Sequence, residues 1–245
     1  MLRTFASALA LILLASATSY AQEPDVIFGA TGTKSSGTVV GMSPTEIKMD
    51  VNGAETVFKV NEIKGLNFGD DPPELTQART RIKEGQLEDA LTELKNINLA
   101  GVTRAVTRQD VDYYTAYCMS KIALGGGGGD KNAAASALFG FYSANKGSYH
   151  FFDSAEILGD LAMALGKYDG AAKFYSELGK APWPETQMKG AVLEARSLMG
   201  EKKFDEAQKK YEGIIGSGLN TPTATRYKQL AQVFRAVCMA ETGKA

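Results

Sequence analysis

The spacing of hydrophobic and polar residues changes near residue 70 of the 245-residue chain. Before that point, short β-branched segments alternate apolar and polar positions. In "EIKMDV" (46–51) every second residue is apolar, which is the period of a half-buried strand. Asn52-Gly53 comes directly after it, and this pair is the strongest short signal for a two-residue hairpin turn. The pattern predicts three or four antiparallel strands within roughly residues 25–68.

A β-module of this size, residues 22–70, has too few residues to be comfortably stable alone. We therefore expect it either to form a compact barrel, of the SH3-like or Sm-like kind, or to pack on the rest of the chain. The stretch "GDDPPE" (69–74) separates it from the C-terminal part of the chain. Asp71 can cap a helix there, and Pro72-Pro73 suit a first helical turn.

From residue 71 to residue 245 the pattern is helical, and three stretches of it line up. Each begins with a small residue, reaches a turn position seven residues later, and then places an apolar residue and an acid before a second small residue. A large residue comes four positions after that second small residue. The stretches are "ARTRIKEGQLEDALTELKNI" (78–97), "GDLAMALGKYDGAAKFYSEL" (159–178) and "ARSLMGEKKFDEAQKKYEGI" (195–214). Small residues let two helices approach closely, and this spacing puts the small and large residues on one face of the second helix.

The aligned stretches resemble the tetratricopeptide repeat (TPR), a helix-turn-helix unit of about 34 residues. The resemblance covers residues 71–245 and implies a mainly α-helical solenoid of about four hairpins plus a terminal helix. In a second copy, the helices 110–124 and 131–144 are separated by five glycines at 125–129. The run comes after a helix and lacks the lysine-hydroxyl pair of a phosphate-binding loop. We therefore interpret it as a lengthened hairpin turn, with Asp130 as the N-cap of the next helix.

Residues 1–21 have the pattern of a secretory signal peptide. Arg3 precedes an apolar run at 5–17, and small residues stand before Gln22, as a cleavage site requires. The run is shorter than the roughly 20 residues that span a membrane. The sequence therefore predicts an exported protein, periplasmic or extracellular, with no integral membrane segment after cleavage.

Charge and composition argue against several function classes. Removing residues 1–21 removes one of the 27 basic residues and none of the 28 acidic ones, which leaves a net charge of −2. Without a basic patch we expect no nucleic-acid partner. Cys118 and Cys238, 120 residues apart in apolar helices, are interpreted as buried hydrophobic residues.

The single histidine, His150, cannot form a zinc site without several well-placed partners. We interpret it as a packing or surface residue at the start of a helix. Trp183, between two prolines in "APWPE", is interpreted as packing in the turn between two repeats, with an exposed aromatic contact as the alternative. We predict no catalytic residue, no cofactor and no metal.

In TPR proteins the first helices of successive hairpins line a concave groove that binds peptides or partner domains. The resemblance implies a set of partner-binding candidates counted from the small residue of each repeat: Arg79, Lys83, Tyr113, Tyr117, Lys121, Glu156, Asp160 and Arg196, with Ile82, Met163, Val192 and Met199 beside them. One TPR subclass clamps a C-terminal carboxylate with asparagines in these helices. The first helices here contain no asparagine, which argues against that mode.

The sequence supports three hypotheses about function. The leading one is an exported, non-enzymatic TPR scaffold that binds a protein or peptide partner through the groove. The alternative is a cell-envelope-binding protein whose β-module recognises polysaccharide or peptidoglycan, with the repeats as a spacer. The least favoured is an enzyme whose site the sequence does not mark.

Overall fold

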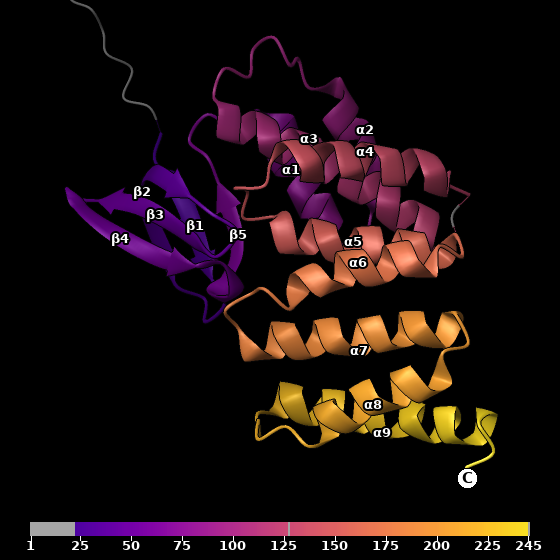
Figure 1. Ribbon diagram of the computed structural model, residues 1–245. Helices are drawn as coiled ribbons and strands as arrows, with labels where there is room; N and C mark the ends of the chain where they lie inside the picture. Colours follow the sequence, from indigo (N-terminus) through magenta and orange to yellow (C-terminus); the bar gives the residue numbers. More distant parts are fainter. Residues whose placement is uncertain (1–22, 127, 245) are drawn as a thin grey trace, which may run out of the picture.

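A computed structural model describes residues 23–126 and 128–244, and the predicted signal peptide lies outside these residues. The described chain forms a sheet followed by a stack of helices (Figure 1). A helical-hairpin solenoid preceded by a small antiparallel sheet is therefore confirmed as the fold class.

The sheet is an antiparallel one in the order β4-β3-β2-β1-β5. Its strands are β1 (Asp25–Gly29), β2 (Lys34–Met42), β3 (Glu46–Val51), β4 (Ala54–Lys59) and β5 (Ile63–Asn67), with a 3-10 turn, η1 (Val60–Glu62), before β5. The long β2 pairs with both β1 and β3, and its register shifts between Val39 and Gly41. Among the described residues no ladder joins β4 to β5, so the sheet is not closed into a barrel by hydrogen bonds.

The prediction of three or four strands was wrong, because the described chain has five. The sequence pattern did not mark β1 and β5 clearly as strands. Both are short, and both depend on pairing with each other across the module, with Val26 opposite Asn67. The predicted hairpin turn is confirmed between β3 and β4. Asn52 and Gly53 both have positive φ, 55° and 86°, as this kind of two-residue turn requires.

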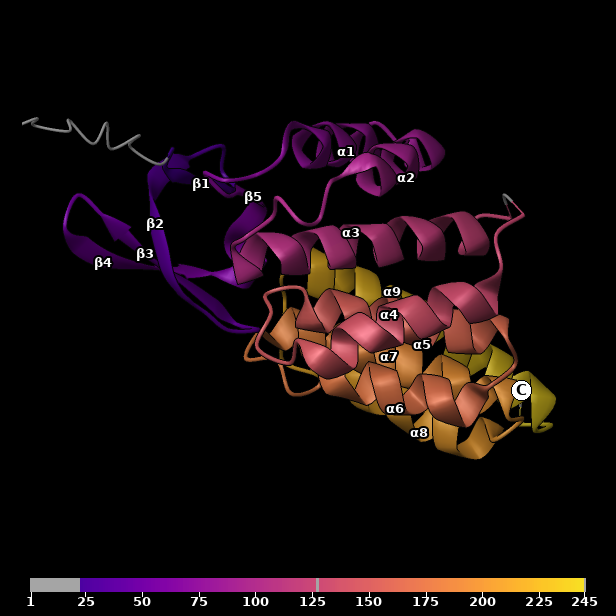
Figure 2. The ribbon, with the colours of Figure 1, turned by 90° about the horizontal axis from the view of Figure 1, so that it is seen from above.

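Nine helices come after the sheet in the part of the chain that the structure describes. They are α1 (Pro73–Lys83), α2 (Leu87–Asn96), α3 (Ala105–Leu124), α4 (Lys131–Ala144), α5 (Phe151–Ala164), α6 (Tyr168–Leu178), α7 (Pro184–Gly200), α8 (Phe204–Ile215) and α9 (Pro222–Glu241). Consecutive helices pack as hairpins, and the first helices α1, α3, α5, α7 and α9 also contact one another in that order. Figure 2 shows the β-module beside one end of this stack, with β4 furthest from it.

The repeat spacing corresponds to close contacts between the two helices of each hairpin. A Cβ added at Gly159 of α5 would lie 2.3 Å from the ring of Tyr175 in α6, so only glycine fits there. Ala78 and Ala195, at the same repeat position, are fully buried. The predicted turn position is left-handed in each copy: φ is 78° at Gly85, 70° at Gly166 and 60° at Lys202.

The five glycines lie between α3 and α4, as the interpretation of a lengthened turn requires. The Asp130 side chain accepts hydrogen bonds from the N–H groups of Asn132 and Ala133, so its predicted role as an N-cap is confirmed. Cys118 and Cys238 are free and buried. Burial raises the pKa of Cys118 to about 12, which suits an unreactive packing residue.

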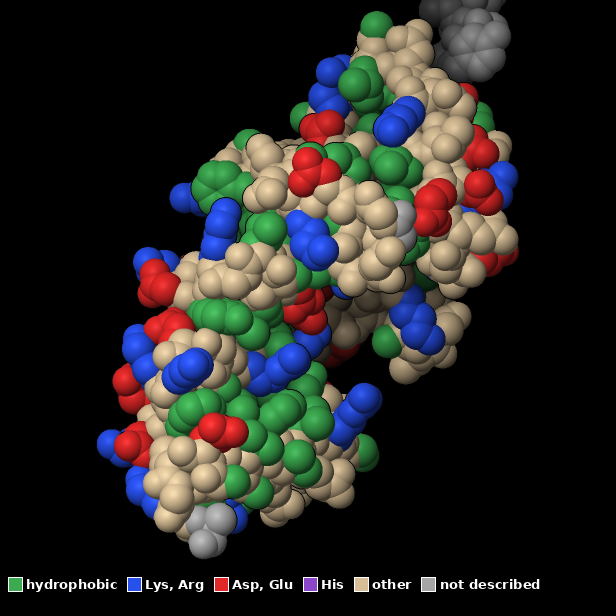
Figure 3. Space-filling model, turned by 90° about the vertical axis from the view of Figure 1, so that its right-hand side faces the viewer, with side chains coloured by type: hydrophobic (Ala, Val, Ile, Leu, Met, Phe, Trp, Pro, Cys, Tyr) green, Lys and Arg blue, Asp and Glu red, His purple; other side chains and the backbone are tan. Residues whose placement is uncertain are grey.

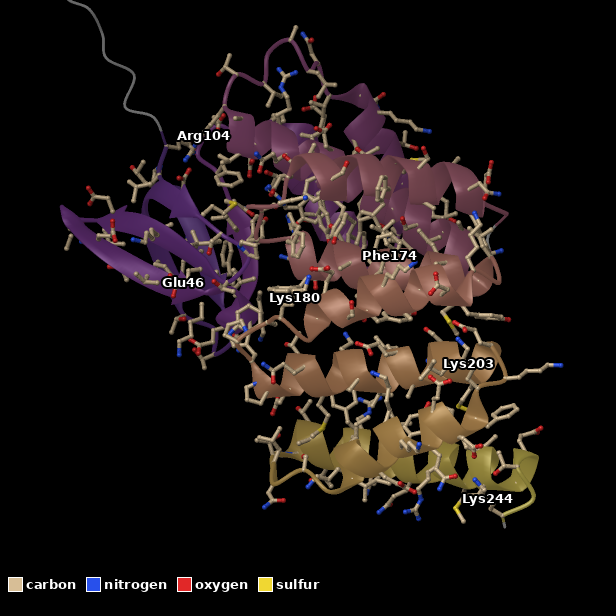
Figure 4. All side chains as sticks on the ribbon, in the orientation of Figure 1. Glu46, Arg104, Phe174, Lys180, Lys203 and Lys244 are labelled. Atoms are coloured by element: carbon tan, nitrogen blue, oxygen red, sulfur yellow. The ribbon has the colours of Figure 1, made fainter. Side chains whose placement is uncertain are left out.

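The β-module is held against the helices by an ion pair between Asp25 of β1 and Arg104, just before α3. The two guanidinium nitrogens donate to the two carboxylate oxygens over 2.6 and 2.8 Å. The N–H groups of Val39 and Gly69 donate to the same carboxylate. Figure 4 labels Arg104 at this junction of the sheet and the helices. The ion pair joins β1 to the start of α3, 79 residues later in the sequence.

Candidate functional site

Three adjoining hollows, which share lining residues, lie where the β-module faces the first helices, and together we call them the inner groove. Their volumes are about 230, 250 and 560 Å³. The first and second hollows share Val60, Ile63, Tyr149 and Asp153, and the second and third share Asn61, Trp183, Thr186 and Lys189. Figure 3 shows the side of the molecule away from the β-module, where the surface is also hollowed beside the middle helices and carries acidic and basic side chains.

The walls of the inner groove come from both parts of the molecule. Its helical side is formed mainly by the first helices α1, α3, α5, α7 and α9 and the residues just before them. The opposite side is formed by η1 and β5, which line the first hollow with Ile63, Lys64, Gly65 and Asn67. The groove therefore crosses every hairpin of the solenoid at a first helix.

Beneath the first hollow lies a buried ionic cluster built around Arg79 of α1. Its guanidinium donates to Asp71, just before α1, and over 2.6 Å to Asp110 of α3. It also lies over the Tyr114 ring, 5.3 Å from the ring centre. Burial opposes the charge of Arg79, but Asp110, Tyr114 and Asp71 raise its pKa overall. Arg79 therefore stays charged and joins α1 to α3.

Asp110 is the acceptor at the centre of this ionic cluster. The Tyr149 hydroxyl donates to it over 3.0 Å, and the Nε2 atom of His150 lies 3.1 Å from it. Burial raises the pKa of Asp110, but His150 and Arg79 outweigh that effect, and the pKa is lowered overall. The His150 ring also stacks on Tyr113, with 3.5 Å between ring centres. These contacts join the start of α5 to α3 and form the floor of the groove.

The second hollow carries an ion pair of its own. Lys189 of α7 donates to Glu156 of α5 over 2.5 Å, which links two successive first helices. Burial raises the pKa of Glu156 although Lys189 opposes this. Trp183, just before α7, packs edge-on against Phe152, with 5.9 Å between ring centres. It is half-buried and lines two hollows, so the predicted packing in the turn between repeats is confirmed, and an exposed aromatic contact stays a prediction.

The structure brings together part of the predicted partner-binding set. Arg79, Lys83, Tyr113 and Tyr117 line the first hollow, and Glu156 lines the second. Within that group, Arg79 and Tyr113 are buried in the floor, whereas Lys83 is exposed and Tyr117 half-buried.

Ile82 also lines the first hollow, whereas the other predicted residues are not among the lining residues of the three hollows. Lys121 lies over the Tyr117 ring, 5.6 Å from its centre, and Asp160 accepts a hydrogen bond from Tyr175. Arg196 is exposed and lies 5.7 Å from the ring centre of Phe234. Val192, which the repeat count placed beside them, is buried in the core of the last hairpins.

The sequence reasoning missed the residues that complete the groove. Asp110 stands three positions before Tyr113 and seven before Tyr117, so it shares their helix face. That spacing could have identified it. Lys64 and Asn67 of β5 carried no signal, because their place opposite the helices depends on how the β-module packs. His150 is buried, which agrees with the packing role predicted for it.

The described residues lack the features of two other kinds of site. In residues 23–126 and 128–244 there is no group of three or more His, Cys, Asp or Glu side chains arranged to hold a metal ion. None of the described helices has the length and apolar character needed to cross a membrane.

No protein-family model matches the chain, and no curated protein sequence matches it either. Among solved structures, a Podosopora anserina putative kinesin light chain protein with nearly identical TPR-like repeats matches with a TM-score of 0.55 at 14% identity, over 70% of this chain and 86% of that one. A second crystal structure of that protein, with one residue substituted, matches with a TM-score of 0.54 at 16% identity, over 70% and 85%. A MamA structure, MSR-1, has a TM-score of 0.49 at 14% identity, over 70% and 86%. The kinesin light chain likeness shows a TPR-like fold.

Proposed function

We propose that this protein is an exported, non-enzymatic scaffold that binds a protein or peptide partner in the inner groove. The observation that carries the proposal is the position of the groove. Its three adjoining hollows are lined by the first helix of every hairpin in the described chain and, on the other side, by residues of η1 and β5. A TPR-like fold supports a role in protein interaction, because stacked hairpins form extended binding surfaces.

The side chains along the groove suit a peptide. Tyr114, Tyr117, Trp183 and Tyr227 are half-buried and line it from α3, the start of α7 and α9. Tyrosine and tryptophan offer a large apolar surface with a polar tip, and such residues contribute most of the binding energy in many interfaces. A partner that covers them would bury this aromatic surface.

Selection from a displayed library of random peptides tests the binding site. We expect peptides enriched on the full chain to bind about tenfold more weakly to Tyr117→Ala and to Trp183→Ala. Phe139→Ala is the matched control, because Phe139 is an aromatic residue that is 51% exposed on α4 and lies outside the three hollows. Peptides that bind all four proteins equally, or a selection that enriches none, would contradict the proposal.

Export is tested separately, by the mass of the chain produced in a bacterial host. We expect an exported chain that begins at Gln22, and a retained chain that begins at Met1 would contradict export. The envelope-binding alternative makes the opposite prediction for the groove. In that case isolated peptidoglycan or polysaccharide would bind the Tyr117→Ala and Trp183→Ala proteins with the same affinity as the unchanged protein.

A further inference from the structure

One wall of the inner groove is the edge of the sheet. β5 is the last strand of the sheet and pairs only with β1 among the described residues, and Figure 1 shows it as the strand next to the helices. The backbone groups on an unpaired strand edge can form hydrogen bonds with another extended chain. Addition of a strand to such an edge is a common way to bind a peptide.

The rim of the first hollow carries charges that the protein does not neutralise. Lys64 belongs to β5 and Lys83 to α1, and both are exposed. The Lys83 ammonium reaches toward the β-module and lies 5.9 Å from the centre of the Phe28 ring. Neither lysine forms an ion pair with any residue in 23–126 or 128–244. Arg79 beneath them is different, because Asp71 and Asp110 already balance its charge. The rim is therefore basic between β5 and α1.

The α5 side of the same hollow has the opposite sign. Asp153 is exposed, lines both the first and second hollows, and forms no ion pair within the described chain. Its position lies beyond the tyrosines of α3 when the groove is followed from α1 to α5. The first hollow therefore carries positive charge at its α1 end and negative charge at its α5 end. A partner with complementary charges would place an acidic side chain at the α1 end and a basic one at the α5 end.

We propose that the partner is an extended peptide segment that runs between β5 and the first helices and places an acidic side chain between Lys64 and Lys83. A basic side chain of the same segment faces Asp153. The inference rests on the proposed function and adds the conformation and charge order of the partner. It also gives the β-module a role in the binding site itself. Exposed charge pairs of this kind set specificity and the rate of association more than total affinity.

The test uses the same random peptide library on the full chain and on the charge-reversed variant Lys64→Glu/Lys83→Glu. We expect peptides enriched on the unchanged protein to carry Asp or Glu at one fixed position and Lys or Arg at another. Their affinity for the variant should fall about tenfold at low salt, and peptides selected on the variant should carry Lys or Arg at the first position. Asp153→Lys should reverse the preference at the second position.

The matched control is Lys167→Glu/Lys209→Glu, which changes net charge equally at two exposed lysines outside the groove. Its affinity for the peptides should stay within about twofold of the unchanged protein. Peptides that lose affinity for Tyr117→Ala and Trp183→Ala but show no charge preference would overturn this inference and leave the proposed function standing. Peptides that respond to none of these changes, or no enriched peptides, would overturn both.

Discussion

The two ends of the molecule are held together by different physical means. Where the β-module meets the helices, Tyr149 and Val106 pack on the apolar core of the sheet, and buried charges are added to this packing: Asp25 pairs with Arg104, and Asp110 joins α1, α3 and the start of α5. In the last hairpins, α7 to α9, the core consists of alanine, methionine, isoleucine and aromatic side chains. Small residues there let helices approach, and large ones fill the space between them. The first arrangement occurs once in the described chain, and the second repeats from hairpin to hairpin.

The difference shows what each arrangement is suited to do. Apolar packing of small against large side chains can be repeated along a solenoid, because it depends only on neighbouring hairpins. Buried charges require defined partners and defined geometry, and removal of one partner is costly. On the groove side, loss of Asp110 or Arg79 should therefore disturb the contacts between α1, α3 and the start of α5.

The largest effect on stability is expected from Asp110→Ala, which disrupts the buried ionic cluster around Arg79. It removes one of the two acids that balance buried Arg79 and the acceptor that Tyr149 and His150 share. We expect a loss of about 3–5 kcal/mol in the free energy of unfolding, measured with urea. Asp112→Ala is the control, because Asp112 lies on an exposed part of the same helix. Equal losses for the two variants would contradict the central place given to Asp110.

Arg104→Ala should cost about 2–3 kcal/mol, because Asp25 keeps its burial and loses its charged partner. Burial raises the pKa of Asp25, but Arg104 and two backbone N–H groups lower it overall. A lowered pKa stabilises the folded protein above the unfolded-state pKa, and that contribution is lost as the pH falls through the folded-state pKa. Below about pH 4, urea unfolding should therefore show the variant approaching the unchanged protein. A constant difference across that range would contradict this role of the ion pair.

Gly159→Ala tests the repeated packing of small against large side chains within a hairpin. The added Cβ would meet the Tyr175 ring, and we expect a cost of about 1–3 kcal/mol. Gly140→Ala is the matched change inside another helix, where nothing lies within 4 Å of the added Cβ. That variant should gain about 0.5–1 kcal/mol, because alanine restricts the unfolded chain. Thermal unfolding distinguishes the two, and a stable Gly159→Ala protein would contradict the close helix contact.

The smallest effect is expected at the glycine turn, on which neither region depends. Replacing the glycines at 125–129 by the short turn Gly-Lys should change stability by less than about 1 kcal/mol, because loop length affects closure entropy only weakly. Binding of the selected peptides should be unchanged, because none of the described glycines of the turn, 125, 126, 128 and 129, lines the three hollows. Unfolding of the shortened chain would show that α3 and α4 do not form a hairpin.

The repetitive region was the part that the sequence could predict. The spacing of Ala90, Ala171 and Ala207, all fully buried, repeats along the chain and results from local helix geometry. The groove could be predicted only in part. Tyr117 and Lys83 were found by the repeat count, but Lys64 reaches the site only because β5 pairs with β1 and the module docks through Asp25. Such long-range packing has no periodic signal. Arg79 was identified and the spacing of Asp110 on α3 could have been noticed, but the pairing of Arg79 with Asp71 and Asp110 and its burial depend on how α1 packs against α3.

Hydrogen exchange on the full chain, with and without a selected peptide, tests most directly whether the β-module and the first helices form one binding site. We expect the peptide to slow exchange on both walls at once, in residues 60–67 and in the groove-lining parts of α3 and α5. Protection confined to the helices would show that β5 takes no part. Protection confined to β2, β3 and β4 would show that the module binds on its own and would contradict the composite groove.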